Sequence, residues 1–429
     1  MKLLLRNGTV YQAEGSVRQD LLIEGNKVFI ADNKIEKRFL KVIQCDNFFI
    51  VPGLVDVHVH FREPGQEYKE TIRTGSMAAA RGGYTTVCTM PNVTPSPTDA
   101  RTLGVQLEAI RKDALINIIP YGRITDGDSL SDMEEMAGRA VSFSDDGHGV
   151  QSEELMRQGM IKAHQLGKII TAHCENESWP AADPRSEYTE AARDLRLAAE
   201  TGCALHICHV SSSVTVALVR EAKKRGVDVT CETAPHYLVL ADRDASDEGK
   251  YKMNPPLRKP ADRQALIEGI KDGTIDMIAT DHAPHSRAEK NGTAGKILNG
   301  ITGLETAFPV LYTRLVETGI ISLAKLAELM STAPAERFGL EGGHIYDGGP
   351  ADLSVWRAGQ RYQIDTSDFL SMGRSTPFEG MEVHAENIMT ISGGKTVWEK
   401  AADVWEKTAD VRRKTGACGK KTGGNENER

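Results

Sequence analysis

The sequence lacks several features that mark particular classes of protein. No uninterrupted apolar run approaches the roughly 18 residues needed to cross a bilayer. The N-terminal MKLLLRNGTV has no apolar core of a secretory signal. Acidic residues outnumber basic ones by 60 to 52, giving a net charge of -8, so the basic stripe of a nucleic-acid-binding protein is not expected. We therefore expect a cytoplasmic protein that binds neither membranes nor nucleic acids.

Closely spaced cysteine pairs are absent as well. The seven cysteines are odd in number, scattered, and never spaced as CxxC. In a chain of 429 residues this pattern is typical of reduced thiols in the cytosol, and it excludes a disulfide framework. The composition, with 40% hydrophobic and 26% charged residues, is ordinary for a globular protein. The length suits one large domain with an accessory piece.

The two ends of the chain have the pattern of short strands. Residues 1–50 alternate apolar and polar residues, with turn signals at Asn7-Gly8 and Gly25-Asn26, and predict antiparallel strands. The strand pattern returns in residues 346–400, so we expect both regions to pair in one small β-domain. Residues 401–429 are charged and rich in glycine, and predict a disordered tail.

Residues 51–345 alternate apolar runs with amphipathic helical segments such as 152–167 and 214–226. The eight runs are VPGLVDVHVH, TTVCTMPN, INIIPYG, AVSFSDDG, KIITAHCEN, ALHICHVSS, VDVTCETAPH and DMIATDHAPH. Eight strand–helix units in succession are the sequence signature of a (β/α)8 barrel. We therefore predict an α/β fold, a TIM-type barrel over residues 51–345 with a small flanking β-domain built from both chain ends.

Residues of the kinds that bind metals stand at the ends of five of these strands. They are His58 and His60, Asp145 and Asp146, His173, His209, and Asp281 and His282. The active site of such a barrel lies at the C-terminal ends of its strands, and imidazole with carboxylate suits zinc and similar divalent ions. A bridging carboxylate can hold two metals roughly 3.5–4 Å apart, as in hydrolytic two-metal sites. The sequence therefore predicts a metal centre.

The remaining histidines lie elsewhere in the pattern. Those in loop or helix segments are expected to be structural or exposed: His148, His164, His344 and His384. His206 lies three residues before His209 and faces the other side of its strand, where we expect it to pack. His236 stands at the end of the seventh strand, where a structural role and a direct role in the site are both compatible with its position.

Seven blocks of the sequence resemble a known family. In order they are VPGLVDVHVHFREPG, GGYTTVCTMPN, FSDDGHGVQ, HCEN, HICHVSS, MNPPLR and IATDHAPH. They resemble the blocks of dihydroorotase in the cyclic amidohydrolase superfamily, in the bacterial type whose first ligand strand reads HxHxREPG. The resemblance covers about residues 1 to 400. It implies a zinc enzyme that closes N-carbamoyl-L-aspartate to dihydroorotate, and reopens it, in de novo pyrimidine (UMP) biosynthesis.

The resemblance also implies the ligands of one or two zinc ions per subunit. They are His58, His60, Asp146, His173, His209 and Asp281. Asp146 would lie between the two metals, where many relatives have a carboxylated lysine. Asp281 would also be the catalytic proton shuttle: a metal-activated hydroxide attacks the ring amide, and Asp281 carries the proton to the leaving nitrogen.

A further set of residues would contact the substrate. It consists of His60, Arg62, Asn92, Asn254, His285, Asn299 and Gly300. Arg62 can bind the substrate carboxylate with two parallel hydrogen bonds. The chain departs from the bacterial type at Asn299-Gly300, where Phe-Gly is frequent. The segment from His285 to Gly300 is rich in glycine and charge, and predicts a lid over the substrate.

Two alternative functions stay open. Another cyclic-amide hydrolase, such as a dihydropyrimidinase or an allantoinase, would share the metal site, but Arg62 and the MNPPLR block favour an acidic substrate. A catalytically silent homologue that serves as a structural partner of aspartate transcarbamoylase would typically lack metal ligands, whereas all of them are present here. A homodimer and a complex with aspartate transcarbamoylase are both compatible with the resemblance.

Overall fold

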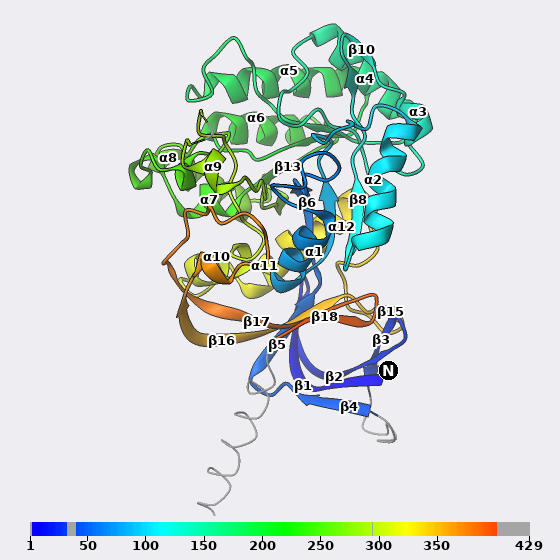
Figure 1. Ribbon diagram of the computed structural model, residues 1–429, viewed down its shortest axis with the longest axis vertical. Helices are drawn as coiled ribbons and strands as arrows, with labels where there is room; N and C mark the ends of the chain where they lie inside the picture. Colours follow the sequence, from blue (N-terminus) through cyan, green and yellow to red (C-terminus); the bar gives the residue numbers. More distant parts are fainter. Residues whose placement is uncertain (1, 32–39, 294, 401–429) are drawn as a thin grey trace, which may run out of the picture.

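The computed structural model describes residues 2–31, 40–293 and 295–400. The tail predicted at 401–429 lies outside these described residues. A broad sheet lies at one end of the molecule, and strands surrounded by helices form the other (Figure 1).

Strands from both ends of the chain form one nine-stranded sheet. Its order is β15-β3-β2-β1-β5-β16-β17-β18, with β4 beside β1. The strands are Lys2–Gln12 (β1), Gly15–Glu24 (β2), Lys27–Ala31 (β3), Leu40–Gln44 (β4), Phe48–Pro52 (β5), Gly349–Pro350 (β15), Leu353–Gln363 (β16), Glu382–Ser392 (β17) and Lys395–Glu399 (β18). β5 pairs antiparallel with β16, and Ile50 lies opposite Val355. Both side chains are fully buried, in an apolar core that belongs to this sheet.

One of the two turns predicted near the N-terminus is wrong. Gly25-Asn26 does join β2 to β3, but Asn7-Gly8 lies inside β1. The pairing of β1 with β2 shifts its register there, and Asn7 has a φ of 60°. Because asparagine tolerates this left-handed conformation, the pair forms an irregularity within a continuous strand instead of a turn.

The middle of the chain forms parallel strands in two sheets, so the α/β class is confirmed. The strands are Leu54–Val59 (β6), Tyr84–Thr89 (β7) and Asn117–Pro120 (β8) in one sheet, and Ile170–Ala172 (β11), Leu205–Ile207 (β12), Val229–Thr233 (β13) and Met277–Ile278 (β14) in the other. Single bridges lie between them: Phe143 pairs with Gly122 and Ile170, and His282 pairs with Val59. Among the described residues the named strands do not form one continuous closed barrel.

The first predicted strand is divided between the two sheets. Val51 and Pro52 belong to β5, and β6 begins at Leu54. A Cβ on Gly53 would lie 2.0 Å from Oγ1 of Thr85, so only glycine fits at the junction. The apolar run is continuous across this point, which is why its pattern predicted a single strand.

The fourth predicted strand is reduced to the bridges at Phe143. Polar side chains around it bind backbone groups of neighbouring loops. Asp145 accepts hydrogen bonds from the backbone N–H groups of Ile124 at 2.8 Å and Thr125 at 3.2 Å. Such side-chain bonds compete with the regular ladder of a strand.

Helices surround the parallel strands (Figure 1). They are Ile72–Arg81 (α1), Ala100–Asp113 (α2), Met133–Met136 (α3), Glu153–Gln165 (α4), Arg185–Thr201 (α5), Ser213–Lys224 (α6), Pro235–Val239 (α7), Pro260–Lys271 (α8), Arg287–Lys290 (α9), Ala307–Leu311 (α10), Leu323–Ala327 (α11) and Ala333–Phe338 (α12). α4 and α6 confirm the two predicted helical segments. Each begins after a serine, Ser152 or Ser212, whose hydroxyl accepts a hydrogen bond from the first turn.

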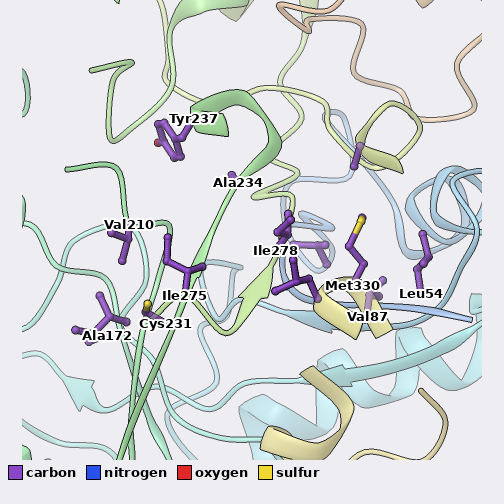
Figure 2. Packing of buried hydrophobic residues seen from close by; sticks show 14 of the residues in the cluster. Leu54, Val87, Ala172, Val210, Cys231, Ala234, Tyr237, Ile275, Ile278 and Met330 are labelled. Atoms are coloured by element: carbon purple, nitrogen blue, oxygen red, sulfur yellow. The ribbon is translucent and has the colours of Figure 1, made fainter. Parts of the chain in front are cut away.

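The second hydrophobic core lies between the parallel strands and these helices. Figure 2 shows Val87 of β7, Ala172 of β11, Cys231 of β13 and Ile278 of β14 in one apolar cluster. This packing fixes the strands, and therefore the polar residues that follow them. No helix in the described part of the chain is long and apolar enough to span a membrane.

Candidate metal and substrate site

Three overlapping groups of buried side chains at the carboxyl ends of the parallel strands have the composition of metal sites. One of them, His58, Asp146 and Cys208, adds a cysteine that the sequence did not predict as a ligand, and the other two contain only predicted ligands. These two groups are His58, His60 and Asp281, and Asp146, His173 and His209. Within each group the candidate ligand atoms lie within 4.8 Å of one another. The two groups together hold the six residues that the sequence predicted as ligands.

Strand geometry explains why the residues meet. His58 stands in β6 and His60 just beyond it, and residues two apart on a strand point to one side. His173 follows β11, His209 follows β12, and Asp281 follows β14. Because these strands are parallel, all their carboxyl ends lie at one edge.

Asp146 lies between the two groups. Its Oδ1 is 3.2 Å from Nε2 of His58 and 3.2 Å from Nδ1 of His173, and 3.7 Å from Nε2 of His209. Burial alone would raise the pKa of this carboxyl, but the surrounding imidazoles hold it well below its usual range. An ionised carboxylate shared by two histidine groups is in the position of a bridging ligand.

The donor set fits a divalent metal. Nδ1 of His173 and Nε2 of His209 lie 2.8 Å apart and both face Asp146. Nε2 of His58 is fully buried and faces two carboxylates, Asp146 at 3.2 Å and Asp281 at 3.6 Å. Nitrogen atoms that converge on a carboxylate, away from water, are the ligands that zinc prefers.

Three residues of this site have strained backbones. Arg62, His209 and Asp281 have φ values of 54°, 34° and 49°. In the described ranges, Asn7 is the one other non-glycine residue with positive φ. Such conformations cost about 1–3 kcal/mol each and persist where the surroundings impose them, which is frequent at functional sites.

A cavity of about 370 Å³ opens above the two groups. It is lined by His60, Arg62, Asn92, Asp146, His173, His209, Asn254, Asp281, His285, Asn299 and Gly300. Every predicted site residue except His58 is thus part of its wall, and His58 is completely buried. His148, for which the sequence suggested no part in the site, also lines the cavity.

Arg62 is a buried cation at the wall of this cavity. Its Nε donates to the carbonyl oxygen of Pro284 at 3.2 Å, and its Nη2 lies 3.4 Å from Nε2 of His285. The residue is only 7% exposed, and in the described part of the chain no carboxylate forms a direct ion pair with it, although Asp281, Asp146 and Glu289 are near enough to stabilise its charge. A buried guanidinium without a direct ion pair is suited to bind an anionic ligand.

The segment predicted as a lid lies against the same cavity. Nζ of Lys290 donates to the carbonyl oxygens of Lys252 at 3.0 Å, Leu298 at 2.8 Å and Gly300 at 2.6 Å. His285 contacts the carbonyl oxygen of Asn299 at 2.7 Å. These bonds hold the segment in the wall, and its movement as a lid stays a prediction.

The sequence patterns did not reveal two carboxylates that contact the predicted ligands. Glu232, in β13, places Oε1 2.6 Å from Nδ1 of His58 and Oε2 3.1 Å from Nε2 of His206. Glu175 places Oε2 2.9 Å from Nε2 of His173. Glu175 stands two residues after His173, so its spacing was a usable signal. Glu232 contacts His58 across 174 positions of the sequence, so no local spacing could indicate this contact.

Other polar residues at the strand ends have structural surroundings. Nδ1 of His282 accepts a hydrogen bond from the backbone N–H of Gly303 at 3.2 Å, and Asp145 binds loop backbone as described above. His206 packs against the ring of Phe338 and bonds Glu232, away from the cavity. His236 is buried outside the cavity lining, and burial lowers its pKa to about 4, so its ring is neutral.

The fold and site agree with what known proteins show. The model of the amidohydrolase family matches residues 49–397, and the chain belongs to this family. The chain is 44% identical to the dihydroorotase of Ligilactobacillus salivarius, over 93% of this chain and 99% of that protein. It is 42% identical to the dihydroorotase of Bacillus cytotoxicus, with the same coverage. The resemblance to dihydroorotases and the class of enzyme, a cyclic amide hydrolase, are thereby confirmed.

Two solved structures similar to this chain are a dihydropyrimidinase and a hydantoinase. The dihydropyrimidinase of Brevibacillus agri has a TM-score of 0.85 at 26% identity, covering 93% of this chain and 95% of its own. The L-hydantoinase of Arthrobacter aurescens has a TM-score of 0.85 at 27% identity, covering 93% and 96%. The α/β fold is therefore shared almost throughout the chain.

Proposed function

We propose that the chain is a zinc-dependent dihydroorotase, which interconverts N-carbamoyl-L-aspartate and dihydroorotate in de novo pyrimidine biosynthesis. The observation that carries this proposal is Arg62, a buried cation without a direct ion pair among the described residues, in the same cavity as two groups of metal-binding side chains. Both proposed substrates have a carboxylate that matches it. The relatives named dihydroorotase add support.

Substrate would be oriented mainly by polar groups of the cavity wall. Arg62 and His285 lie side by side and would bind the carboxylate. Oδ1 of Asn92 contacts Nδ1 of His60 at 2.9 Å, and Nδ2 donates to Oδ2 of Asp146 at 3.5 Å, so the second N–H of the amide would be available to the substrate. Asn254, Asn299 and Gly300 would complete the wall around the ring.

The two proposed zinc ions would be held by the two ligand groups, with Asp146 between them. When bound, zinc supplies an activated water and polarises the amide carbonyl. Asp281 lines the cavity, with Oδ1 3.1 Å from Nε2 of His60 and 3.6 Å from Nε2 of His58. Although burial opposes it, these imidazoles lower the pKa of Asp281, so its carboxylate is ionised. It can therefore accept a proton and deliver it to the leaving ring nitrogen.

We also propose an architecture, a cellular location and an oligomeric state for the enzyme. Residues 51–345 would form a (β/α)8 TIM-type barrel, closed through the bridges at Phe143 and His282, and residues 1–50 and 346–400 a small β-domain. The enzyme would act in the cytoplasm. It would assemble as a homodimer or with aspartate transcarbamoylase, which sizing the protein alone and mixed with that enzyme would distinguish.

The first test measures the ultraviolet absorbance of dihydroorotate as the purified protein opens its ring, together with bound zinc. Ring opening is expected with zinc present, and removal of zinc by a chelator should abolish it until zinc is restored. A folded, zinc-loaded protein that does not turn over dihydroorotate would contradict the proposal.

The likeness to hydantoinase structures favours one second candidate, a hydrolase of uncharged cyclic amides. Arg62→Met separates the two functions. For a dihydroorotase, the variant should lose the charge-assisted bond to the carboxylate, worth about 1.5–3 kcal/mol, and KM should rise roughly 10- to 100-fold. For a hydantoinase, turnover of hydantoin or dihydrouracil should be present in the wild type and survive the substitution.

A further inference from the structure

Glu175 contacts both the proposed metal site and the proposed substrate site. It follows β11 within the segment His173–Asn176, two residues after His173. Its Oε2 lies 2.9 Å from Nε2 of His173 and accepts a hydrogen bond of 2.8 Å from Nδ2 of Asn254. Its backbone carbonyl accepts a further bond of 2.8 Å from Nε2 of Gln151, which anchors the residue. One carboxylate oxygen thus joins two residues that are about 80 positions apart in the sequence.

The contact with His173 determines which ring nitrogen can bind a metal. A carboxylate can only accept hydrogen bonds, so the nitrogen beside Glu175, Nε2, carries the proton. Nδ1 also faces a carboxylate, Asp146 at 3.2 Å, and lies 2.8 Å from His209. Because Asp146 and His209 belong to the ligand group and Glu175 does not, a metal would take the lone pair of Nδ1, and Nε2 would keep its proton against Glu175. Glu175 therefore presents the correct nitrogen of His173 to the metal.

The contact with Asn254 determines which side of its amide faces a ligand. The same argument places the amide N–H group of Asn254 against Glu175. The carbonyl oxygen Oδ1 is left as the free polar atom of a side chain that lines the cavity. Asn254 would then accept a hydrogen bond, and the ring N–H of a cyclic amide is a matching donor.

We propose that Glu175 is a positioning residue that couples metal binding to substrate binding. It fixes the tautomer of His173 and the amide orientation of Asn254 at the same time, and touches neither metal nor substrate itself. The inference deepens the proposed function and rests on it for the identity of the substrate.

The experiment compares Glu175→Leu, Glu175→Gln and the control Glu177→Gln in the full-length protein. In Glu175→Leu, zinc affinity measured by competition with a chelator should fall by about 10- to 100-fold, the usual effect of losing the hydrogen-bond partner of a metal-bound histidine. Glu175→Gln keeps a carbonyl acceptor and should be intermediate. Glu177 is exposed and two residues further on, so Glu177→Gln should leave zinc affinity unchanged.

A second readout tests the coupling to substrate. At saturating zinc, Asn254→Ala and Glu175→Leu should each raise KM for dihydroorotate, by roughly 2- to 10-fold for one hydrogen bond. Combined, they should raise KM by less than the product of the single effects, because both remove the same interaction. Circular dichroism confirms that each variant is folded.

The two measurements distinguish a failure of the proposed function from a failure of the inference about Glu175. A wild type that binds zinc without turning over dihydroorotate would contradict the proposed function, and zinc affinity would still test Glu175. Unchanged zinc affinity in Glu175→Leu would overturn the inference, as would full multiplicative effects on KM in the double variant.

Discussion

The nine-stranded sheet and the carboxyl ends of the parallel strands each have a buried part, and the two parts bury different chemistry. The sheet buries apolar side chains such as Ile50 and Val355. The strand ends bury imidazoles, carboxylates and a guanidinium, in a cavity wall with strained backbone at Arg62, His209 and Asp281. Burial of an apolar side chain contributes about 1.5–3 kcal/mol of stability, whereas burial of a charged group costs free energy unless it is paired. Substitutions in the two regions should therefore separate stability from activity.

The largest effect is expected for Asp281→Asn at the strand ends. Without a carboxylate to carry the proton, kcat should fall by about 10²- to 10⁴-fold, while the melting temperature stays near that of the wild type. Steady-state kinetics and a thermal melt on the same preparation check this. Retention of more than a tenth of the wild-type kcat would exclude Asp281 as the proton carrier.

Ile50→Ala in the sheet should lower stability and leave kcat unchanged. The side chain is fully buried beside β1 and β16, and its truncation should lower the free energy of unfolding by about 2–5 kcal/mol. The kcat of the folded enzyme should not change. Denaturant titration and kinetics at low temperature measure the two quantities, and a loss of kcat at unchanged stability would contradict the separation of roles.

A smaller effect is expected for Glu232→Gln, which keeps the shape of the side chain but removes its charge behind His58. Zinc affinity should fall by about tenfold, the lower end for loss of such a partner. The matched control is Glu399→Gln, at an ion pair with Lys41 in the sheet. Surface pairs contribute about 0–1 kcal/mol, and zinc affinity should be the same as in the wild type. Equal zinc affinity in both variants would show that Glu232 has no influence on the metal.

An effect of similar size concerns backbone strain. His209→Gly and His209→Ala both remove the imidazole, but glycine tolerates the positive φ. The glycine variant should be more stable than the alanine variant by about 1–2 kcal/mol. In the sheet, Asn7→Gly should differ little from the wild type, because asparagine already tolerates this conformation. Equal stability of the two His209 variants, by denaturant titration, would mean that the position is not strained.

Local patterns predicted the features that repeat along one strand or helix. The spacing of His58 and His60 placed both on one side of β6, and the serine before α4 marked its start. Two predictions of secondary structure were wrong because the tertiary structure overrode a local sequence signal. The apolar run across Gly53 hid a change of sheet, and Asn7-Gly8 has the composition of a turn but lies in a strand.

Contacts between distant segments could not be predicted in this way. Glu232 meets His58 only because β6 and β13, which belong to different sheets, come together in the folded chain. Glu175 meets Asn254 only through the path of the chain after β13. Residue types and spacing identify candidate ligands, whereas the carboxylates that orient them depend on tertiary structure.

The pairing of β5 with β16 has a consequence for biosynthesis. Roughly 300 residues separate the two strands, and a ribosome adds about 5–20 residues per second, so β5 emerges some 15–60 s before its partner. During that time Phe48–Pro52, an apolar strand, presents an unpaired edge on the nascent chain. A chain that terminates before Leu353 has no β16 to cover this edge, and an unpaired apolar edge is a template for pairing with other chains.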